Sequence, residues 1–211
     1  MLHEQDIYQQ RYIEHQAKKR QQLAPSSGET DWKKYSAEEI AALFAVLKNR
    51  RTQRTFNSSP ITQEEMDKLA KAMAASPSSC NRQAIVGRVI SERDEKELLS
   101  GLLVGGVGWS HRADKIVILF ADQRAYKSPA EQAFMPYLDA GARIMTMYVA
   151  TEAIGVGAAY INPNIREANK ELFAKRFGGE GLIFCGAMAL GHYDTRVGAS
   201  PRRTARQVWL K

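Results

Sequence analysis

A long segment with almost no charge, about Glu131 to Ile154, sets the strictest condition on the fold. After its first turn its only charged residues are Asp139, Arg143 and Glu152. A helix of this length with so few charges must be covered over much of its surface. The segment therefore predicts either the central buried helix of a domain or a helix at the interface of a dimer.

Apolar runs on both sides of this segment predict a covered sheet. Lys115 to Ala121 and Leu182 to Gly191 are nearly continuous apolar runs, and Ala84 to Ile90 and Ala158 to Ile161 are shorter ones. Continuous apolar strands are typical of sheets that are covered on both faces. Helical patterns alternate with the strands, and no repeat or linker interrupts the chain after residue 35. We therefore expect one α+β domain over residues 36–211.

Helix starts are marked by side chains that bond to the first turn. Ser36 with Glu39 and Thr62 with Glu65 form capping boxes, and Asn164 with Glu167 predicts a further helix that ends at Gly178-Gly179. The first of these helices places apolar residues on one face, namely Ile40, Leu43, Phe44 and Leu47.

Residues 1–35 form an N-terminal extension or arm in this interpretation. They are polar and Gln-rich, with a helix expected through Ile7 to Leu23 and a break at residues 24–28. The beginning of the chain lacks the basic and then apolar pattern of a leader, and no apolar stretch is long enough to span a membrane. The two cysteines, Cys80 and Cys185, suit a reducing compartment, so we expect a cytoplasmic protein with Cys80 as a small buried thiol.

The net charge of +7 is concentrated in two short stretches. Lys48 to Arg54 holds four basic residues and Arg196 to Lys211 holds five, with no acidic residue in either. Removing these nine from the total of 30 leaves 21 basic against 23 acidic residues. Two compact clusters favour one small anion over a nucleic acid, whose binding face spreads its cations along a stripe. We expect neither a nucleic-acid partner nor a membrane partner.

The first basic stretch has the composition of a phosphate site. Arg50, Arg51 and Arg54 surround the hydroxyl of Thr52 directly after a predicted helix. Arginine holds phosphate oxygens in two places at once and keeps its charge at any cellular pH. The alternative is a basic helix end that is only solvated.

A loop of small and amide-bearing residues, Ser76 to Gln83, leads into the first strand. Its side chains offer donors and acceptors to the edge of a heterocycle. A plain helix-to-strand connection has a similar composition, so both interpretations stay open at this point.

Taken in chain order, these blocks resemble the FMN-dependent nitroreductase family over about residues 36–206. Arg50-Arg51-Thr52-Gln53-Arg54-Thr55-Phe56 is similar to the family's opening Arg-Arg-Ser-x-Arg-x-Phe, and Pro77 to Gln83 is similar to its Pro-Ser-x-x-Asn-x-Gln loop. Asp139-Ala140-Gly141 through Gly155-Val156-Gly157, with the closing strand and the tail at Pro201-Arg202-Arg203, resembles the rest of the family pattern. The resemblance implies a nitroreductase-like fold, with a mainly antiparallel central sheet flanked by helices and one long central helix.

The resemblance also implies a cofactor site for FMN. The residues that it implies in cofactor binding are Arg50, Arg51, Thr52, Arg54, Arg202 and Arg203 around the phosphate, Pro77, Ser78, Ser79, Asn81 and Gln83 around the ring and ribityl chain, and Tyr160, Ile161 and Asn162 as backbone beside the flavin. It further implies NAD(P)H as electron donor, an electron-poor small-molecule acceptor such as a nitro compound or quinone, ping-pong kinetics and a homodimer. No side chain is needed as acid or base, so no catalytic residue is assigned; the histidines lack metal-ligand spacing, so no metal is expected.

Two departures from the family pattern keep alternatives open. Ala84-Ile85 stand where the family often has Pro-Trp, and Pro163 stands where a Gly is common and has no backbone N–H to donate. A flavin-binding protein of the same fold without reductase turnover is one alternative. A flavin-consuming, dimethylbenzimidazole synthase-like enzyme is another, but Thr52 replaces the Asp of that branch.

Overall fold

The computed structural model describes residues 4–22, 34–204 and 208. The elements are α1 (Glu4–Gln22), α2 (Ala37–Asn49), α3 (Gln63–Ala74), β1 (Ile85–Ile90), α4 (Arg93–Leu102), β2 (Lys115–Asp122), α5 (Pro129–Ala153), β3 (Gly157–Ile161), α6 (Lys170–Phe177) and β4 (Leu182–Gly191). The chain divides into two units, Met1–Ile40 and Ala41–Lys211. The expected boundary at residue 35 stays a prediction, and the expected break at residues 24–28 lies outside the described residues.

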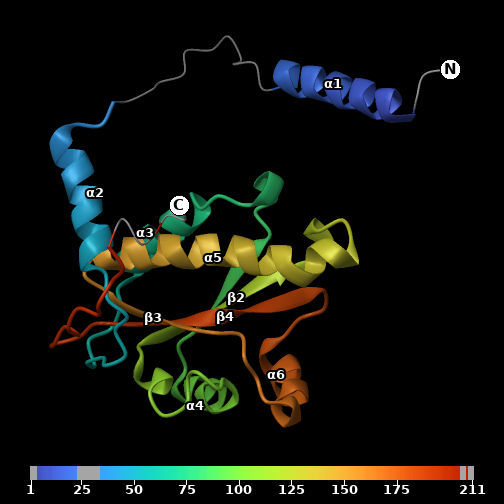
Figure 1. Ribbon diagram of the computed structural model, residues 1–211. Coiled ribbons are helices and arrows are strands. Elements are labelled where there is room, and N and C mark those ends of the chain that lie inside the picture. The colour runs from blue at the N-terminus through green and yellow to red at the C-terminus, as the bar shows by residue number, and fades with distance from the viewer. Residues whose placement is uncertain (1–3, 23–33, 205–207, 209–211) are drawn as a thin grey trace. The chain divides into compact units, whose positions relative to one another are not determined.

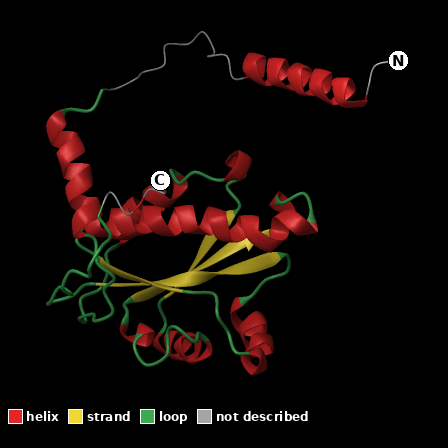
Figure 2. Ribbon diagram, viewed as in Figure 1, coloured by secondary structure: helices red, strands yellow, loops and turns green. Residues whose placement is uncertain are grey.

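The second unit is built on a four-stranded sheet with the order β1-β2-β4-β3. All three neighbouring pairs are antiparallel, and Ile116 of β2 faces Ala189 of β4 in the register. Helices α3 and α5 lie over one face of this sheet, and α4 and α6 lie over the other (Figures 1 and 2). The predicted α+β class, with an antiparallel sheet between helices and one long helix, is confirmed.

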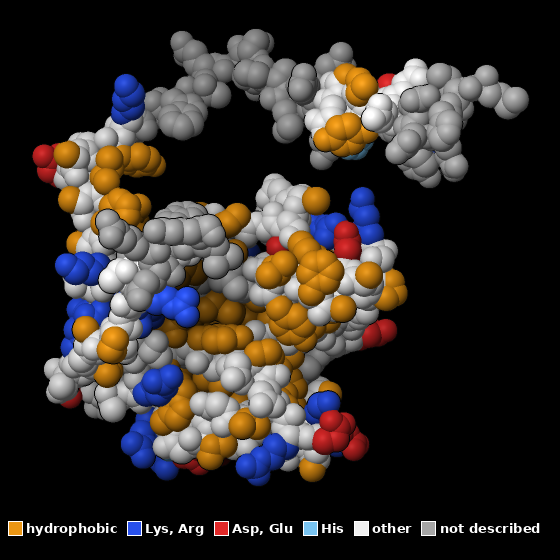
Figure 3. All heavy atoms as spheres, viewed as in Figure 1, with side chains coloured by type: hydrophobic (Ala, Val, Ile, Leu, Met, Phe, Trp, Pro, Cys, Tyr) orange, Lys and Arg blue, Asp and Glu red, His pale blue; other side chains and the backbone are white. Residues whose placement is uncertain are grey.

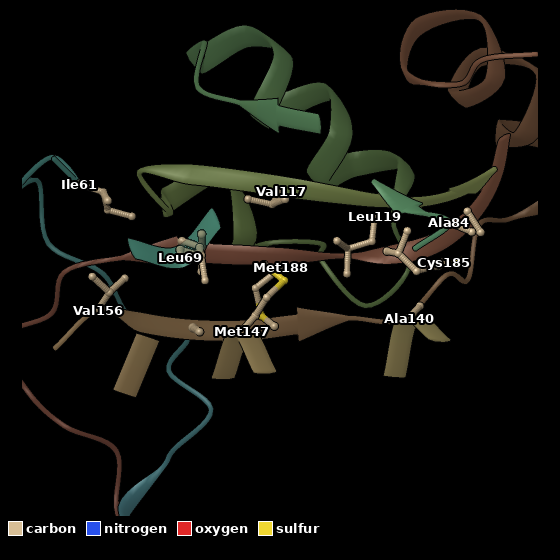
Figure 4. Packing of buried hydrophobic residues seen from close by; sticks show 14 of the residues in the cluster. Ile61, Leu69, Ala84, Val117, Leu119, Ala140, Met147, Val156, Cys185 and Met188 are labelled. Atoms are coloured by element: carbon tan, nitrogen blue, oxygen red, sulfur yellow. The ribbon is translucent and has the colours of Figure 1, made fainter. Parts of the chain in front are cut away.

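Helices cover both faces of the sheet, so one apolar core lies on each face. On one face Met147 of α5, Leu69 of α3 and Met188 of β4 pack in one cluster (Figure 4). On the other face Phe173 and Phe177 of α6 pack against residues of α4 and β2. Strands β2 and β4 lie between these cores, which explains why their sequences are continuously apolar.

Helix α5 is covered on one face only. Its N-terminus is capped by Ser128, whose Oγ accepts a hydrogen bond from the Glu131 N–H. Met147 is buried against the sheet, whereas Phe134 is 52% and Leu138 61% exposed. The outward face of α5 therefore leaves an apolar strip uncovered in a single chain.

The two capping boxes form as predicted, but the third helix start is wrong. The Thr62 hydroxyl accepts from the Glu65 N–H while the Glu65 carboxylate accepts from the Thr62 N–H, and Ser36 with Glu39 repeats the pattern. Asn164 does not begin a helix, because its carbonyl accepts a hydrogen bond from Val104 and the following residue forms a β-bridge. Helix α6 begins only at Lys170, after a turn of 3-10 helix.

Candidate functional site

Residues 50–54 leave the end of α2 and run beside β3. One Arg51 amino group donates to the Lys48, Asn49 and Arg50 carbonyls at 3.0, 2.8 and 3.0 Å, so this guanidinium also caps the helix. The Gln53 N–H donates to the Ala158 carbonyl of β3 at 2.9 Å. The basic stretch is thus fixed against the edge of the sheet.

The residues after β4 return to the same edge and close a cavity with residues 51–54. This cavity has a volume of about 260 Å³. It is lined by Arg51, Thr52, Arg54, Val197, Gly198, Ser200 and Arg202. We call this set the phosphate cradle. It brings together residues from the two basic stretches, and Lys and Arg side chains gather on the side of the body where α2 ends (Figures 1 and 3).

The donors of the phosphate cradle suit a phosphate group. Three guanidinium groups and the Thr52 hydroxyl line it, and none of the lining residues is acidic. The Arg54 Cζ lies 5.6 Å from the centre of the Trp109 ring, in the range of a cation–π contact. Trp109 was not among the predicted site residues, because nothing in the sequence shows that its loop reaches Arg54.

Two predicted phosphate residues lie outside this cavity lining. The Arg50 Cζ is 4.7 Å from the centre of the Tyr148 ring of α5, so Arg50 is engaged beside the cradle. Arg203 is exposed in the segment that follows Arg202. Their assignment to the phosphate stays a prediction.

The predicted ring-binding loop, residues 77–83, has an unusual backbone. Cys80, Asn81 and Gln83 have positive φ angles of 52°, 54° and 52°. Such angles are uncommon in residues other than glycine and persist only where the surroundings hold them. The Ser78 hydroxyl accepts from the Gln83 N–H at 2.9 Å, and the Gln83 side chain donates to the Asn81 side chain at 3.1 Å. Both amide side chains are exposed and available to a ligand.

Cys80 is exposed in this loop, so the expectation of a buried thiol is wrong for this residue. Cys185 is buried in β4, and burial raises the pKa of its thiol to about 12. That thiol therefore stays protonated at physiological pH.

Asp139 of α5 anchors the loop of residues 77–83 through hydrogen bonds. Its Oδ1 accepts from the Ser79 N–H and hydroxyl, both at 2.8 Å, and its Oδ2 accepts from the Tyr126 hydroxyl at 3.0 Å. Burial, together with the neighbouring carboxylate, raises the pKa of Tyr126 well above its usual value. The aspartate of the Asp139-Ala140-Gly141 block thus positions the loop that contains Asn81 and Gln83.

The predicted backbone contacts at the end of β3 differ in their availability. The Tyr160 N–H donates to the Tyr148 hydroxyl at 2.8 Å, and the Tyr160 hydroxyl donates to the Cys185 carbonyl at 2.9 Å. Ile161 is 1% exposed. Asn162 is exposed at the end of the strand, beside Gly105. Among these three predicted residues, Asn162 is therefore the most accessible.

The phosphate cradle and the ring-binding loop are tied to different parts of α5. The loop is anchored at Asp139, and the segment leading to Arg202 is anchored through Arg196, which donates to Glu152. Thirteen residues of helix separate these anchors, which is about 20 Å at 1.5 Å per residue. The two parts of the predicted site are thus anchored at separate positions along α5.

Other candidate chemistry is limited. No cluster of three potential metal ligands occurs among the described residues. No helix within the described part of the chain combines the length and apolar character needed to cross a membrane. A second cavity of about 320 Å³ lies between α3, β1 and α5, and none of the predicted site residues lines it.

Comparisons with known proteins agree with this fold. Residues 47–107 match the model described as the nitroreductase family. The chain is 24% identical over 170 residues to the FMN reductase (NAD(P)H) of Bacillus subtilis strain 168, covering 74% of this chain and 68% of the relative.

Solved structures give the same result. A Desulfovibrio desulfuricans protein assigned to the nitroreductases and solved in complex with FMN is 25% identical, with a TM-score of 0.68 over 80% of this chain and 95% of the other. An FMN-dependent nitroreductase from Clostridium difficile R20291 is 20% identical, with a TM-score of 0.64 over 75% and 91% of the two chains. The chain therefore has the nitroreductase fold, and its residues 47–107 match the nitroreductase family.

Proposed function

We propose that this protein is an NAD(P)H-dependent FMN oxidoreductase that reduces an electron-poor small molecule. The observation that carries the proposal is the phosphate cradle, where Arg51, Thr52, Arg54 and Arg202 line one cavity. Similarity to an FMN reductase and to a structure solved with FMN supports flavin as the phosphate-bearing ligand. Arg50 and Arg203 extend the positive charge around the cradle.

The remaining predicted residues are proposed to hold the flavin ring. Asn81 and Gln83 present exposed amides on a rigid loop, and residues 77–79 shape its approach. The backbone from Tyr160 to Asn162 is proposed to lie beside the ring. Residues with fixed donors and acceptors orient such a ring without reacting themselves.

We propose a homodimer in which each flavin site is built from both chains. The cradle and the ring-binding loop are anchored about 20 Å apart along α5, which supports a second copy supplying one of them. The outward face of α5 is apolar and exposed, and Figure 3 shows hydrophobic side chains spread over this face of the body. Burial of this strip against a second copy would remove apolar surface from water.

In this proposal FMN would supply the redox chemistry, namely hydride acceptance from NAD(P)H and delivery to the acceptor. The chain holds the phosphate, orients the ring and leaves one face open for the two substrates in turn. That arrangement predicts ping-pong kinetics and needs no side chain as general acid or base. We propose the cytoplasm as the location, since the free thiols suit a reducing compartment.

The first test is an absorbance spectrum of the purified protein, followed by anaerobic addition of NADH or NADPH. A yellow protein bleached by either nucleotide supports the reductase. A yellow protein that neither nucleotide bleaches supports the alternative of flavin binding without turnover, which the missing N–H of Pro163 favours.

The second test removes charge from the cradle. Arg54→Ala and Arg202→Ala are each expected to weaken FMN binding by about 10- to 100-fold, since each removes a charge-assisted hydrogen bond to phosphate. Arg93→Ala on α4 is the control, because Arg93 is exposed and forms its ion pair with Glu97 of the same helix. Unchanged affinity in both cradle variants would overturn the site assignment.

A further inference from the structure

A buried glutamine lies between the two basic stretches. Gln53 is 2% exposed, although its neighbours Thr52 and Arg54 point into the phosphate cradle. Buried amides need partners for their oxygen and for their two N–H groups. Gln53 finds these partners in two segments that are far apart in the sequence.

The hydrogen bonds of Gln53 join residues 53–55 to residues 195–197. Its amide nitrogen donates to the Thr55 carbonyl at 2.9 Å, to the Thr55 hydroxyl at 2.7 Å and to the Thr195 carbonyl at 3.0 Å. Its amide oxygen accepts from the Val197 N–H at 3.2 Å. The Gln53 side chain is therefore hydrogen-bonded to the backbone of residues 195 and 197, on both sides of residue 196.

Gln53 itself has little freedom to move. Its backbone N–H is bonded to Ala158 of β3. A Cβ built on Gly157 would lie 2.9 Å from the Gln53 Cγ and 2.8 Å from the Tyr193 ring, so these side chains pack directly on the glycine backbone. The position of the amide is thus set by the sheet.

The segment that follows Thr195, to which Gln53 is hydrogen-bonded, forms one side of the phosphate cradle. Val197, Gly198, Ser200 and Arg202 line the cavity, and residues 196–204 have no helix or strand. Without a ladder of backbone bonds, the place of Arg202 depends on anchors such as Gln53 and Arg196. Because Gln53 is bonded both to β3 and to residues 195 and 197, its position fixes where the segment that leads to Arg202 lies.

We infer that Gln53 is a positioning residue that assembles the two basic stretches into one phosphate site. By holding Thr195 and Val197, it sets the distance of Arg202 from Arg54. The chain's preference for FMN over riboflavin, which lacks the phosphate, therefore depends on a side chain that touches neither. This inference rests on the proposed function and adds the residue that sets its phosphate specificity.

The main test is Gln53→Met, which keeps the length of the side chain and removes its hydrogen bonds. The dissociation constants of FMN and riboflavin are measured by quenching of flavin fluorescence. FMN affinity is expected to fall about tenfold or more, as for the loss of one charge-assisted contact. Riboflavin affinity is expected to change less than about twofold, because no part of the ring site is altered. Gln132→Met on α5 is the matched control and should change neither.

A double-mutant cycle tests whether Gln53 acts through Arg202. In the Arg202→Ala background, Gln53→Met should weaken FMN binding by less than about twofold. Equal effects of Gln53→Met in both backgrounds would overturn the inference, as would equal losses for FMN and riboflavin.

A second pair of variants tests the hydrogen bond between Val197 and Gln53 by changing Val197, in case Gln53→Met folds poorly. Val197→Pro removes the N–H that donates to Gln53, whereas Val197→Ala keeps it. The proline variant should lose more of the preference for FMN over riboflavin than the alanine variant, since both alter the Val197 side chain and only proline removes the N–H. If the unchanged protein prefers FMN and both Gln53→Met and Val197→Pro keep that preference, this inference alone is overturned. A parent protein that binds neither flavin defeats the proposed function and the inference together.

Discussion

At the scale of single residues, Asp139 anchors the predicted ring-binding loop through two part-buried hydrogen bonds from Ser79 and accepts a buried one from Tyr126. Asp139→Ala would leave the Ser79 N–H, the Ser79 hydroxyl and the Tyr126 hydroxyl without their acceptor. We expect the free energy of unfolding in urea to fall by about 3 kcal/mol, because the buried Tyr126 hydroxyl and the two part-buried Ser79 donors are left without a partner.

Asp139→Asn is the matched control for this prediction. The Asn oxygen can still accept from Ser79, and its amino group can donate to the Tyr126 hydroxyl, which then acts as acceptor. The loss is expected to be less than about 1.5 kcal/mol, from the missing charge alone. Equal losses in the two variants would show that the hydrogen bonds of Asp139 do not hold the loop.

The residues that line the phosphate cradle could be predicted from the sequence, whereas the residues that hold them in place could not. Arginines beside a hydroxyl are a local pattern, and Arg51, Thr52 and Arg54 do line one cavity with Arg202. The role of Gln53 depends on Thr195, 142 positions away, and no periodicity links two such segments. Buried polar contacts between distant segments depend on the folded geometry, which one sequence does not contain.

At the scale of elements, β4 contains a bulge that requires glycine. The register between β2 and β4 shifts at Leu119 and Phe120, opposite Gly186, whose φ is +112°. A Cβ on Gly186 would lie 2.5 Å from the Tyr160 ring and 2.7 Å from the Ile161 carbonyl. The bulge therefore lets β4 pack closely on β3 at Tyr160 and Ile161, two of the predicted flavin contacts.

Gly186→Ala is expected to lower the free energy of unfolding by about 3 kcal/mol or more, from steric overlap and the positive φ together. Gly101→Ala in α4 is the control, because a Cβ there meets no atom within 4 Å. The control should be neutral or raise stability by up to about 1 kcal/mol, since Ala favours helix. Urea unfolding of both variants measures the contrast, and a tolerated Gly186→Ala would argue against this bulge.

Elements were predictable where their signal is local. Strands β2 and β4 appear as continuous apolar runs, and the capping boxes of α2 and α3 form as expected. The start of α6 was misplaced because Asn164 has the residue type of a cap but its backbone is used by Val104. A tertiary hydrogen bond between two loops overrode a local preference.

At the scale of the whole molecule, α2 and α5 each carry exposed apolar residues among the residues that the structure describes. Helix α2 has no buried residue, and Phe44 on its predicted apolar face is 63% exposed. The outward face of α5 is exposed as well. An amphipathic pattern predicts that a face will be covered but not by which chain, so the buried and interface alternatives for the long helix were equally compatible with its sequence.

The proposed dimer makes a prediction about which chain supplies each part of a site. One chain with Arg54→Ala and Arg202→Ala keeps its loop, and another with Asn81→Ala and Gln83→Ala keeps its cradle. Each variant alone should lose FMN. If the cradle of one copy works with the loop of the other, a heterodimer of the two variants contains one intact site and one site with both parts altered.

Co-expression with two different affinity tags isolates this heterodimer, and its flavin content is read from absorbance. We expect about half the FMN of the unchanged dimer, because one of two sites is intact. If cradle and loop came from the same chain, both sites of the heterodimer would be defective and it would be colourless. A dimer of the unchanged chain is the positive control, and dimers of each variant alone give the background. The distance of about 20 Å between the two anchors on α5 favours the first outcome.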